Sequence, residues 1–195
     1  MTDPAVQAAC TILKKHGIRF AIVGGQAVAL NAATATRDVD VMVTTDDYHA
    51  AVQRLSSDDA LTFAYDGGAV TRFGIQALRG VPLDVVDAGF FAGAKTGKEF
   101  FDFLIGEGSA ETEGVRYATP EVVWYTRLLT KRWQSYAEKI VTNVIDGLSP
   151  DLLERVQEIG RRFGTEETIR ARIAYVREEL NRPDLDALLR KDRGR

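Results

Sequence analysis

The sequence predicts an α/β (α+β) domain with a mixed sheet and flanking helices, followed by a separate α-helical domain. Short apolar runs typical of strands alternate with helical segments up to about residue 118. Beyond that point, apolar residues recur almost only at helical spacing. Thr119-Pro120-Glu121 marks the change, because a capping residue followed by proline is typical of a helix start. We therefore expect one domain over residues 1–118 and a helical domain over 119–195.

Turn and cap residues delimit the elements of the first domain. Gly17 follows two lysines and a histidine, as expected for a helix end. Thr44-Thr45-Asp46-Asp47 is typical of a helix start, and Arg79-Gly80 of a two-residue hairpin turn. The expected helices cover residues 4–16, 26–33, 48–55 and 95–105, and the expected strands cover 19–23, 37–43, 70–78, 81–86 and 114–118.

The second domain reads as helical throughout. Its breaks are Ser149-Pro150-Asp151, Gly164-Thr165 and Arg182-Pro183-Asp184. Residues 120–195 contain 15 Lys and Arg against 13 Asp and Glu, a slightly basic balance that weakly favours a polyanionic partner. The expected helices cover residues 120–136, 138–147, 150–163, 165–180 and 184–192.

Composition narrows the class of protein. The 195 residues are 45% hydrophobic, enough for one sizeable core, and the net charge of −3 argues against a positively coated nucleic-acid binder. The single cysteine, Cys10, excludes an intramolecular disulfide and a cysteine-based zinc cluster. There is no signal-peptide pattern and no apolar stretch of the roughly 20 residues that a membrane span needs. We expect a soluble cytoplasmic protein without a membrane partner.

Gly24-Gly25 lies between a predicted strand and a predicted helix. Glycine lets the backbone approach a ligand closely, and a helix start offers unpaired N–H groups to a phosphate. The alternative is a tight turn without a ligand, which is the more common use of such a pair.

Asp38-Val39-Asp40 places two carboxylates on one face of a predicted strand, because residues i and i+2 point the same way. Two like charges held close together are unfavourable unless a cation neutralises them, and paired oxygen ligands suit Mg²⁺. The alternative is that both acids line the solvated face of an edge strand. Met42 continues their face, which suggests that the face is covered further along.

The two motifs together resemble the DNA polymerase beta-like nucleotidyltransferase superfamily. Its signature, an apolar strand, a glycine pair, a helix and an apolar-flanked Asp-x-Asp, reads here as Ile22-Val23-Gly24-Gly25 and Asp38-Val39-Asp40-Val41. The family usually has a third carboxylate on a later strand. Asp84 has the apolar setting for it, and Asp87 is the second candidate.

A looser similarity extends to residue 146 and points to the abortive-infection toxin-type branch. Residues 118–129 look like the segment that opens that branch's helical lobe, with Arg127 where lysine is usual. Residues 142–146 keep only the last acid of its later motif, and Gln26 stands where many members have a small hydroxyl residue. These departures concern the activity of the branch more than the metal site.

The resemblance implies transfer of a nucleoside monophosphate from a nucleoside triphosphate to an acceptor hydroxyl at a two-metal Mg²⁺ site. Asp38, Asp40 and Asp84 would be the catalytic and metal-binding residues. The expected nucleotide-binding residues are Gly24, Gly25, Gln26, Arg127 and Lys131. For the last two, a solvated helix face is an equally good interpretation.

The acceptor is open at this stage. The toxin-type resemblance favours RNA or tRNA, with an antitoxin protein as a partner; a protein or a small molecule is the alternative. Aromatic residues on the predicted helix would either stack on a base or belong to the core: Trp124, Tyr125 and Trp133.

Three other functions are alternatives to this one. A haloacid-dehalogenase-type phosphatase has its Asp-x-Asp after a strand, whereas here the apolar run follows the acids. A Rossmann dinucleotide binder needs a three-glycine spacing that Gly24-Gly25 lacks. The third rival is a nucleotidyltransferase fold that no longer catalyses and serves as a binding or partner module.

Overall fold

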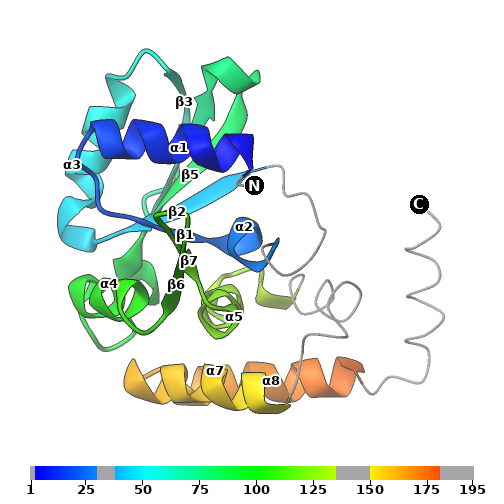
Figure 1. Ribbon diagram of the computed structural model, residues 1–195. Coiled ribbons are helices and arrows are strands. Elements are labelled where there is room, and N and C mark those ends of the chain that lie inside the picture. Colours follow the sequence, from blue (N-terminus) through cyan, green and yellow to red (C-terminus); the bar gives the residue numbers. More distant parts are fainter. Residues whose placement is uncertain (1–2, 30–37, 135–149, 181–195) are drawn as a thin grey trace, which may run out of the picture. The chain divides into compact units, whose positions relative to one another are not determined.

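The computed structural model describes residues 3–29, 38–134 and 150–180 (Figure 1). The chain divides into two compact units, Met1–Val123 and Trp124–Arg195, which are described separately below. Among the described residues, no helix is both long and apolar enough to cross a bilayer.

The first unit is built on a seven-stranded mixed sheet with the strand order β3-β4-β5-β2-β1-β7-β6. Strands β2 and β5 are parallel, as are β1 and β7, and the other neighbours are antiparallel. This arrangement confirms the expected α/β class with a mixed sheet. The strands are β1 (Ala21–Val23), β2 (Val39–Val43), β3 (Leu61–Asp66), β4 (Val70–Ile75), β5 (Val81–Asp87), β6 (Ser109–Thr112) and β7 (Val115–Ala118).

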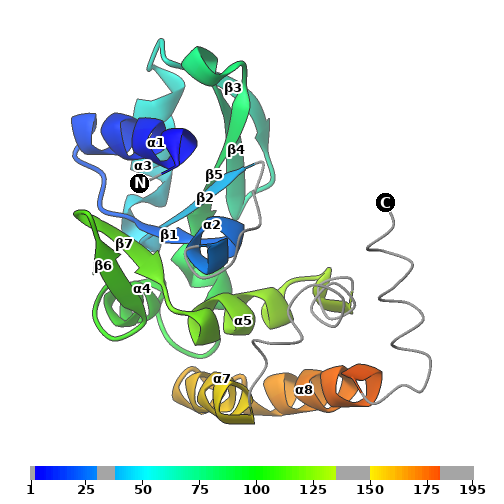
Figure 2. The same cartoon turned by 45° about the vertical axis from the view of Figure 1, so that its right-hand side comes forward.

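Helices of the first unit begin at residues suited to capping. The side chains of Asp3 and Thr44 accept hydrogen bonds from the first turns of α1 and α3, and Thr96 forms a capping box with Glu99 on α4. Helices α1 and α3 lie together over the half of the sheet that contains β2 to β5 (Figures 1 and 2). The helices are α1 (Pro4–Lys15), α2 (Gly24–Ala29), α3 (Thr45–Ser56), α4 (Gly97–Ile105) and α5 (Pro120–Leu129), with short 3₁₀ helices η1 (Gln76–Leu78) and η2 (Ala88–Phe91).

The two central parallel strands divide their side chains between the two faces of the sheet. Val39 and Val41 on β2 stand beside Leu83 and Val85 on β5, and all four are fully buried. Because side chains alternate along a strand, the residues between them point to the opposite face. The core therefore fixes which face of the sheet carries the intervening acids.

The second unit is helical in its described part. Helix α7 (Pro150–Arg162) packs against α8 (Glu166–Leu180), and Gly160 lies so close to Ile169 that an added Cβ would be 3.2 Å from it. The end of α5 also belongs to this unit, where the hydroxyl groups of Tyr125 and Thr165 are 3.2 Å apart. These contacts agree with the expected helical character of the C-terminal region.

Several boundaries differ from the sequence-based expectations. Strands β3 and β6 were not predicted; both are edge strands of mostly exposed residues, so they lack the alternating pattern that marks a half-buried strand. Helix α5 ends at Leu129 rather than at residue 136. Two expected helices, over 138–147 and 184–192, lie outside the described residues. So do residues 30–33 of the helix expected over 26–33.

Candidate functional site

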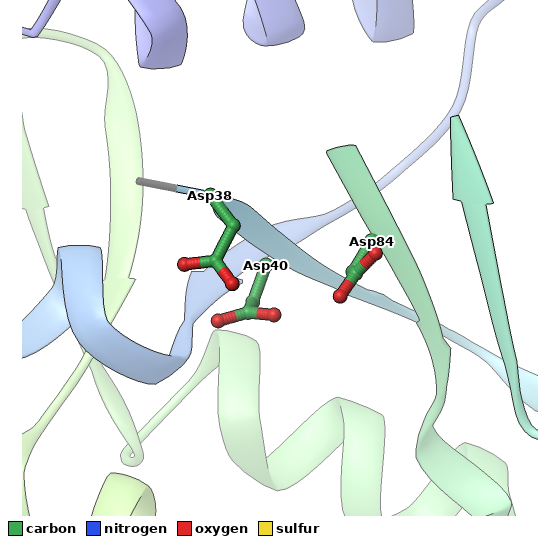
Figure 3. A group of neighbouring side chains, drawn as sticks. All are labelled: Asp38, Asp40 and Asp84. Atoms are coloured by element: carbon green, nitrogen blue, oxygen red, sulfur yellow. The ribbon is translucent and has the colours of Figure 1, made fainter. Parts of the chain in front are cut away.

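Strand β2 places two acids side by side. Asp38 directly precedes the strand and Asp40 is its second residue, and both side chains extend from the same face in Figure 3. Both residues are half-buried, while Val39 between them is fully buried in the core. Met42 continues the acid face and is also fully buried, in agreement with the expectation that this face is covered further along.

Strand β5 brings in the third acid. The parallel register sets Asp84 directly beside Asp40, and the Asp84 side chain is only 9% exposed. One carboxylate oxygen from each of Asp38, Asp40 and Asp84 lies within 4.8 Å of the others (Figure 3). We call these three residues the acid group.

Gly24 makes room for the acid group. It follows β1 with a φ of +63°, in the left-handed region that favours glycine. A Cβ added there would lie 2.0 Å from Oδ2 of Asp40 and 2.8 Å from its Cγ. The glycine is therefore required by close packing against an acid. The predicted role of Gly24 in nucleotide binding stays a prediction.

Arg72 on β4 is a member of the site that the sequence analysis missed. Its Nε and Nη2 donate to Oδ1 and Oδ2 of Asp84 at 2.7 and 2.6 Å, a bidentate pair. This hydrogen-bonded pair raises the pKa of Arg72, and the charges of Asp84, Asp38 and Asp40 contribute in the same direction. Arg72 thus lies in the combined field of all three acids.

The acid group fits a divalent cation. Mg²⁺ takes oxygen ligands at about 2.0–2.1 Å, so opposite ligands of one ion are separated by roughly 4 Å. The 4.8 Å spread of the three oxygens is close to that value. The three residues therefore offer the hard oxygen ligands that such a cation takes.

Asp87, the second candidate for the third acid, has a different position. It ends β5, where its Oδ1 accepts hydrogen bonds from the hydroxyl of Thr45 at 2.6 Å and from the backbone N–H of Gly89 at 2.8 Å. It caps η2 and lies an odd number of residues from Asp84, on the other face of the strand. Of the two candidates, the structure brings only Asp84 to the acid group.

The remaining predicted nucleotide-binding residues are spread over both units. Gly25 and Gln26 lie on α2, Gly25 half-buried and Gln26 only 7% exposed. Arg127 and Lys131 belong to the second unit, where the guanidinium of Arg127 lies 5.6 Å from the ring centroid of Trp124 and Lys131 is exposed. Their approach to a nucleotide stays a prediction.

Two of the predicted aromatic residues are core residues. Trp124 is 2% exposed and Tyr125 is fully buried, with its ring 6.3 Å from that of Phe163. Burial of this kind leaves no free ring face, so these two do not support stacking on a base. Trp133 is half-buried and forms an edge contact with Tyr175.

Comparison with known proteins gives matches to solved structures alone. No protein-family model matches the sequence, and no curated protein matches it. The solution structure of the antibiotic-resistance factor ANT(2″)-Ia is 14% identical with a TM-score of 0.46, over 98% of this chain and 96% of its own.

Two further structures match at a similar level. A crystal structure of ANT(2″)-Ia in complex with adenylyl-2″-tobramycin is 16% identical with a TM-score of 0.43, over 89% of this chain and 95% of that one. JHP933 from Helicobacter pylori is 12% identical with a TM-score of 0.40, over 94% and 96%. Similarity at this level does not define an activity or a substrate for this chain.

Proposed function

We propose that this protein is a Mg²⁺-dependent nucleotidyltransferase that moves a nucleoside monophosphate from a nucleoside triphosphate to an acceptor hydroxyl. The observation that supports this most is the acid group itself, in which two adjacent parallel strands hold three carboxylate oxygens within 4.8 Å. Carboxylates gathered in this way are unfavourable by themselves and suit divalent cations.

The acid group would hold the cations. Asp38, Asp40 and Asp84 would hold the two Mg²⁺, with Asp84 on the acceptor side. Bound Mg²⁺ supplies Lewis-acid stabilisation of the phosphate charge and lowers the pKa of the acceptor hydroxyl. The bond from the α-phosphorus to its bridging oxygen breaks, a bond from that phosphorus to the acceptor oxygen forms, and pyrophosphate leaves. Asp84 would also take the acceptor's proton.

The phosphates of the donor would be held by backbone and cationic groups. Gly24, where an added Cβ would lie 2.0 Å from Oδ2 of Asp40, and Gly25 after it would offer their backbone N–H groups to the phosphates. Gln26 would contribute from the same turn. Arg127 and Lys131 would neutralise the triphosphate from the helical unit.

RNA or tRNA is the acceptor that we propose, with this chain as the toxin of a toxin–antitoxin pair and an antitoxin protein as its partner. The slightly basic balance of residues 120–195 supports a polyanionic acceptor. A protein or a small molecule is the alternative acceptor class.

A radiolabel transfer assay tests the reaction. The purified chain is incubated with Mg²⁺, total RNA and each α-labelled nucleoside triphosphate in turn, beside the Asp38→Ala/Asp40→Ala variant. Label that enters RNA with the wild type but not with the variant would support both the reaction and the acceptor. Transfer to a protein or a small molecule would keep the reaction and replace the acceptor.

A catalytically inactive binding module is the second candidate, and one observation favours it. Arg72 occupies both oxygens of Asp84, the residue proposed to take the proton. Binding of a Mg²⁺-nucleotide without transfer to any acceptor class would support this candidate.

Asp84→Asn separates the roles of the acids. We expect turnover to fall by more than about a hundredfold while nucleotide affinity changes little, because the amide cannot accept the proton. Turnover equal to that of the wild type would disprove the role proposed for Asp84.

A further inference from the structure

The Arg72–Asp84 pair joins a partly exposed side chain to a buried one. The side chain of Arg72 is 41% exposed, whereas that of Asp84 is 9% exposed and lies on a central strand. The guanidinium therefore has solvent into which it can withdraw, and the carboxylate does not. If the pair separates, Arg72 is the residue that moves.

The sheet aligns this pair with the acid group. The register sets Arg72 opposite Asp84, and Asp84 beside Asp40, so the three residues form one row across β4, β5 and β2. Side chains directly opposite on neighbouring strands are about 5 Å apart at Cβ. A cation bound by Asp40 and Asp84 would consequently lie within a few ångströms of the guanidinium.

A positive charge at that range acts against a second one. Without a cation, the guanidinium offsets part of the repulsion among the three carboxylates. With a cation, the guanidinium and the metal repel each other and also share the electron density of Asp84. The same contact that stabilises the metal-free protein thus weakens metal binding.

We propose that Arg72 is an exchangeable counter-ion, which pairs with Asp84 in the metal-free protein and is displaced when a divalent cation binds the acid group. This inference rests on one part of the proposed function, the binding of a divalent cation by the acid group, and it does not require the transfer reaction. Arg72 acts through Asp84 and is a positioning residue. It sets the divalent-ion concentration at which the acid group becomes loaded.

Metal affinity, measured without substrate, tests the inference. Mn²⁺ is titrated into the full chain and followed by the paramagnetic resonance signal of the free ion, for the wild type, Arg72→Gln and Arg72→Lys. We expect Arg72→Gln to bind Mn²⁺ roughly tenfold more tightly, because one nearby positive charge has been removed. Arg72→Lys keeps the charge without the bidentate fork and should lie between the two.

Arg116→Gln is the matched control. Arg116 on β7 is also 41% exposed and pairs with a carboxylate, that of Glu111 at 3.2 Å, on the half of the sheet beyond β1. It should leave the Mn²⁺ affinity unchanged. Thermal unfolding gives a second measurement: Arg72→Gln should melt lower than the wild type without metal and show the larger rise in Tm with Mn²⁺.

Two results of the Mn²⁺ titration would overturn the inference. Equal or weaker Mn²⁺ binding by Arg72→Gln than by the wild type would overturn the inference and leave the proposed metal site intact. An absence of Mn²⁺ binding in both would overturn the inference and the proposed function together. If Arg72→Gln does not fold without metal, the comparison of Arg72→Lys with the wild type decides in the same way.

Discussion

Asp58 and the acid group, both in the first unit, have opposite surroundings. Asp58, which follows α3, has a side chain that is 2% exposed and accepts from Lys15 Nζ at 2.9 Å and from the backbone N–H of Ala60 at 2.9 Å. Nε2 of His16 lies 2.6 Å from the same carboxylate. The acid group, by contrast, gathers three carboxylates, and Arg72 donates to both oxygens of one of them, Asp84.

The contrast separates a carboxylate whose charge is compensated by its neighbours from carboxylates that lie close to one another. The bonds from Lys15, Ala60 and His16 hold the pKa of Asp58 well below its usual range, so its charge is compensated within the fold. The acid group concentrates like charge on one face of the sheet, which costs stability unless a cation joins it. Removing an acid should therefore have opposite consequences in the two places.

The largest effect is expected from the acid group. Asp38→Ala/Asp40→Ala should lower transfer by at least about a thousandfold, because two of the proposed metal ligands are lost. The free energy of unfolding should stay the same or rise, since repulsion is relieved. Transfer assays and denaturant unfolding measure the two quantities. Full activity in this double variant would disprove the assignment of the site.

Next in size is the effect of filling the space at Gly24. Gly24→Ala should destabilise the fold and weaken Mn²⁺ binding, because its Cβ would displace the Asp40 carboxylate. Gly17→Ala is the control: Gly17 has nearly the same φ, +64°, with nothing within 4 Å of the added atom. It should lose only about 1 kcal/mol of unfolding free energy, the usual cost of this backbone region. Equal losses in both variants would argue against the contact with Asp40.

A smaller effect is expected at Asp58. Asp58→Asn should lower the free energy of unfolding at pH 7 by about 2 kcal/mol, the range for buried hydrogen bonds to a charged group. Mn²⁺ affinity should not change, because Asp58 does not belong to the acid group. Chemical denaturation and metal titration of the same preparation check both statements. A changed metal affinity would show that the two groups are coupled.

The smallest effect is the pH dependence of that difference. The pKa of Asp58 is lower in the folded than in the unfolded chain, so its stabilisation is complete above the unfolded value and fades as pH falls towards the folded one. The gap in unfolding free energy between wild type and Asp58→Asn should thus shrink between about pH 5 and pH 2. A gap that widens on acidification would contradict the compensation by Lys15 and His16.

The sequence was sufficient for the local part of the site. Two acids at i and i+2 on a strand must share a face, and valines between them mark the buried side, so Asp38 and Asp40 were placed correctly on a common face. The glycine pair was correctly expected at the end of the first strand. Asp84 came from the family resemblance, because its pairing with Asp40 depends on two strands that lie far apart in the sequence.

Arg72 could not be predicted because the hairpin register was wrong. A two-residue turn at Arg79-Gly80 would pair residue 78 with 81 and place Arg72 opposite Asp87. The actual connection also includes η1, so that Ile75 pairs with Val81 and Arg72 with Asp84. Arg79 adopts the left-handed region, which is uncommon for a residue other than glycine and gives no clear signal in the sequence.

The strand order has a consequence for the sequence of folding events. Strands β4 and β5 form a local hairpin, whereas β2 joins β5 in parallel across a long connection that includes α3 and β3. Local hairpins close sooner than long-range parallel pairs. Arg72 should therefore pair with Asp84 before β2 adds to the sheet. Asp38 and Asp40 would then approach an Asp84 carboxylate whose charge is already offset by Arg72.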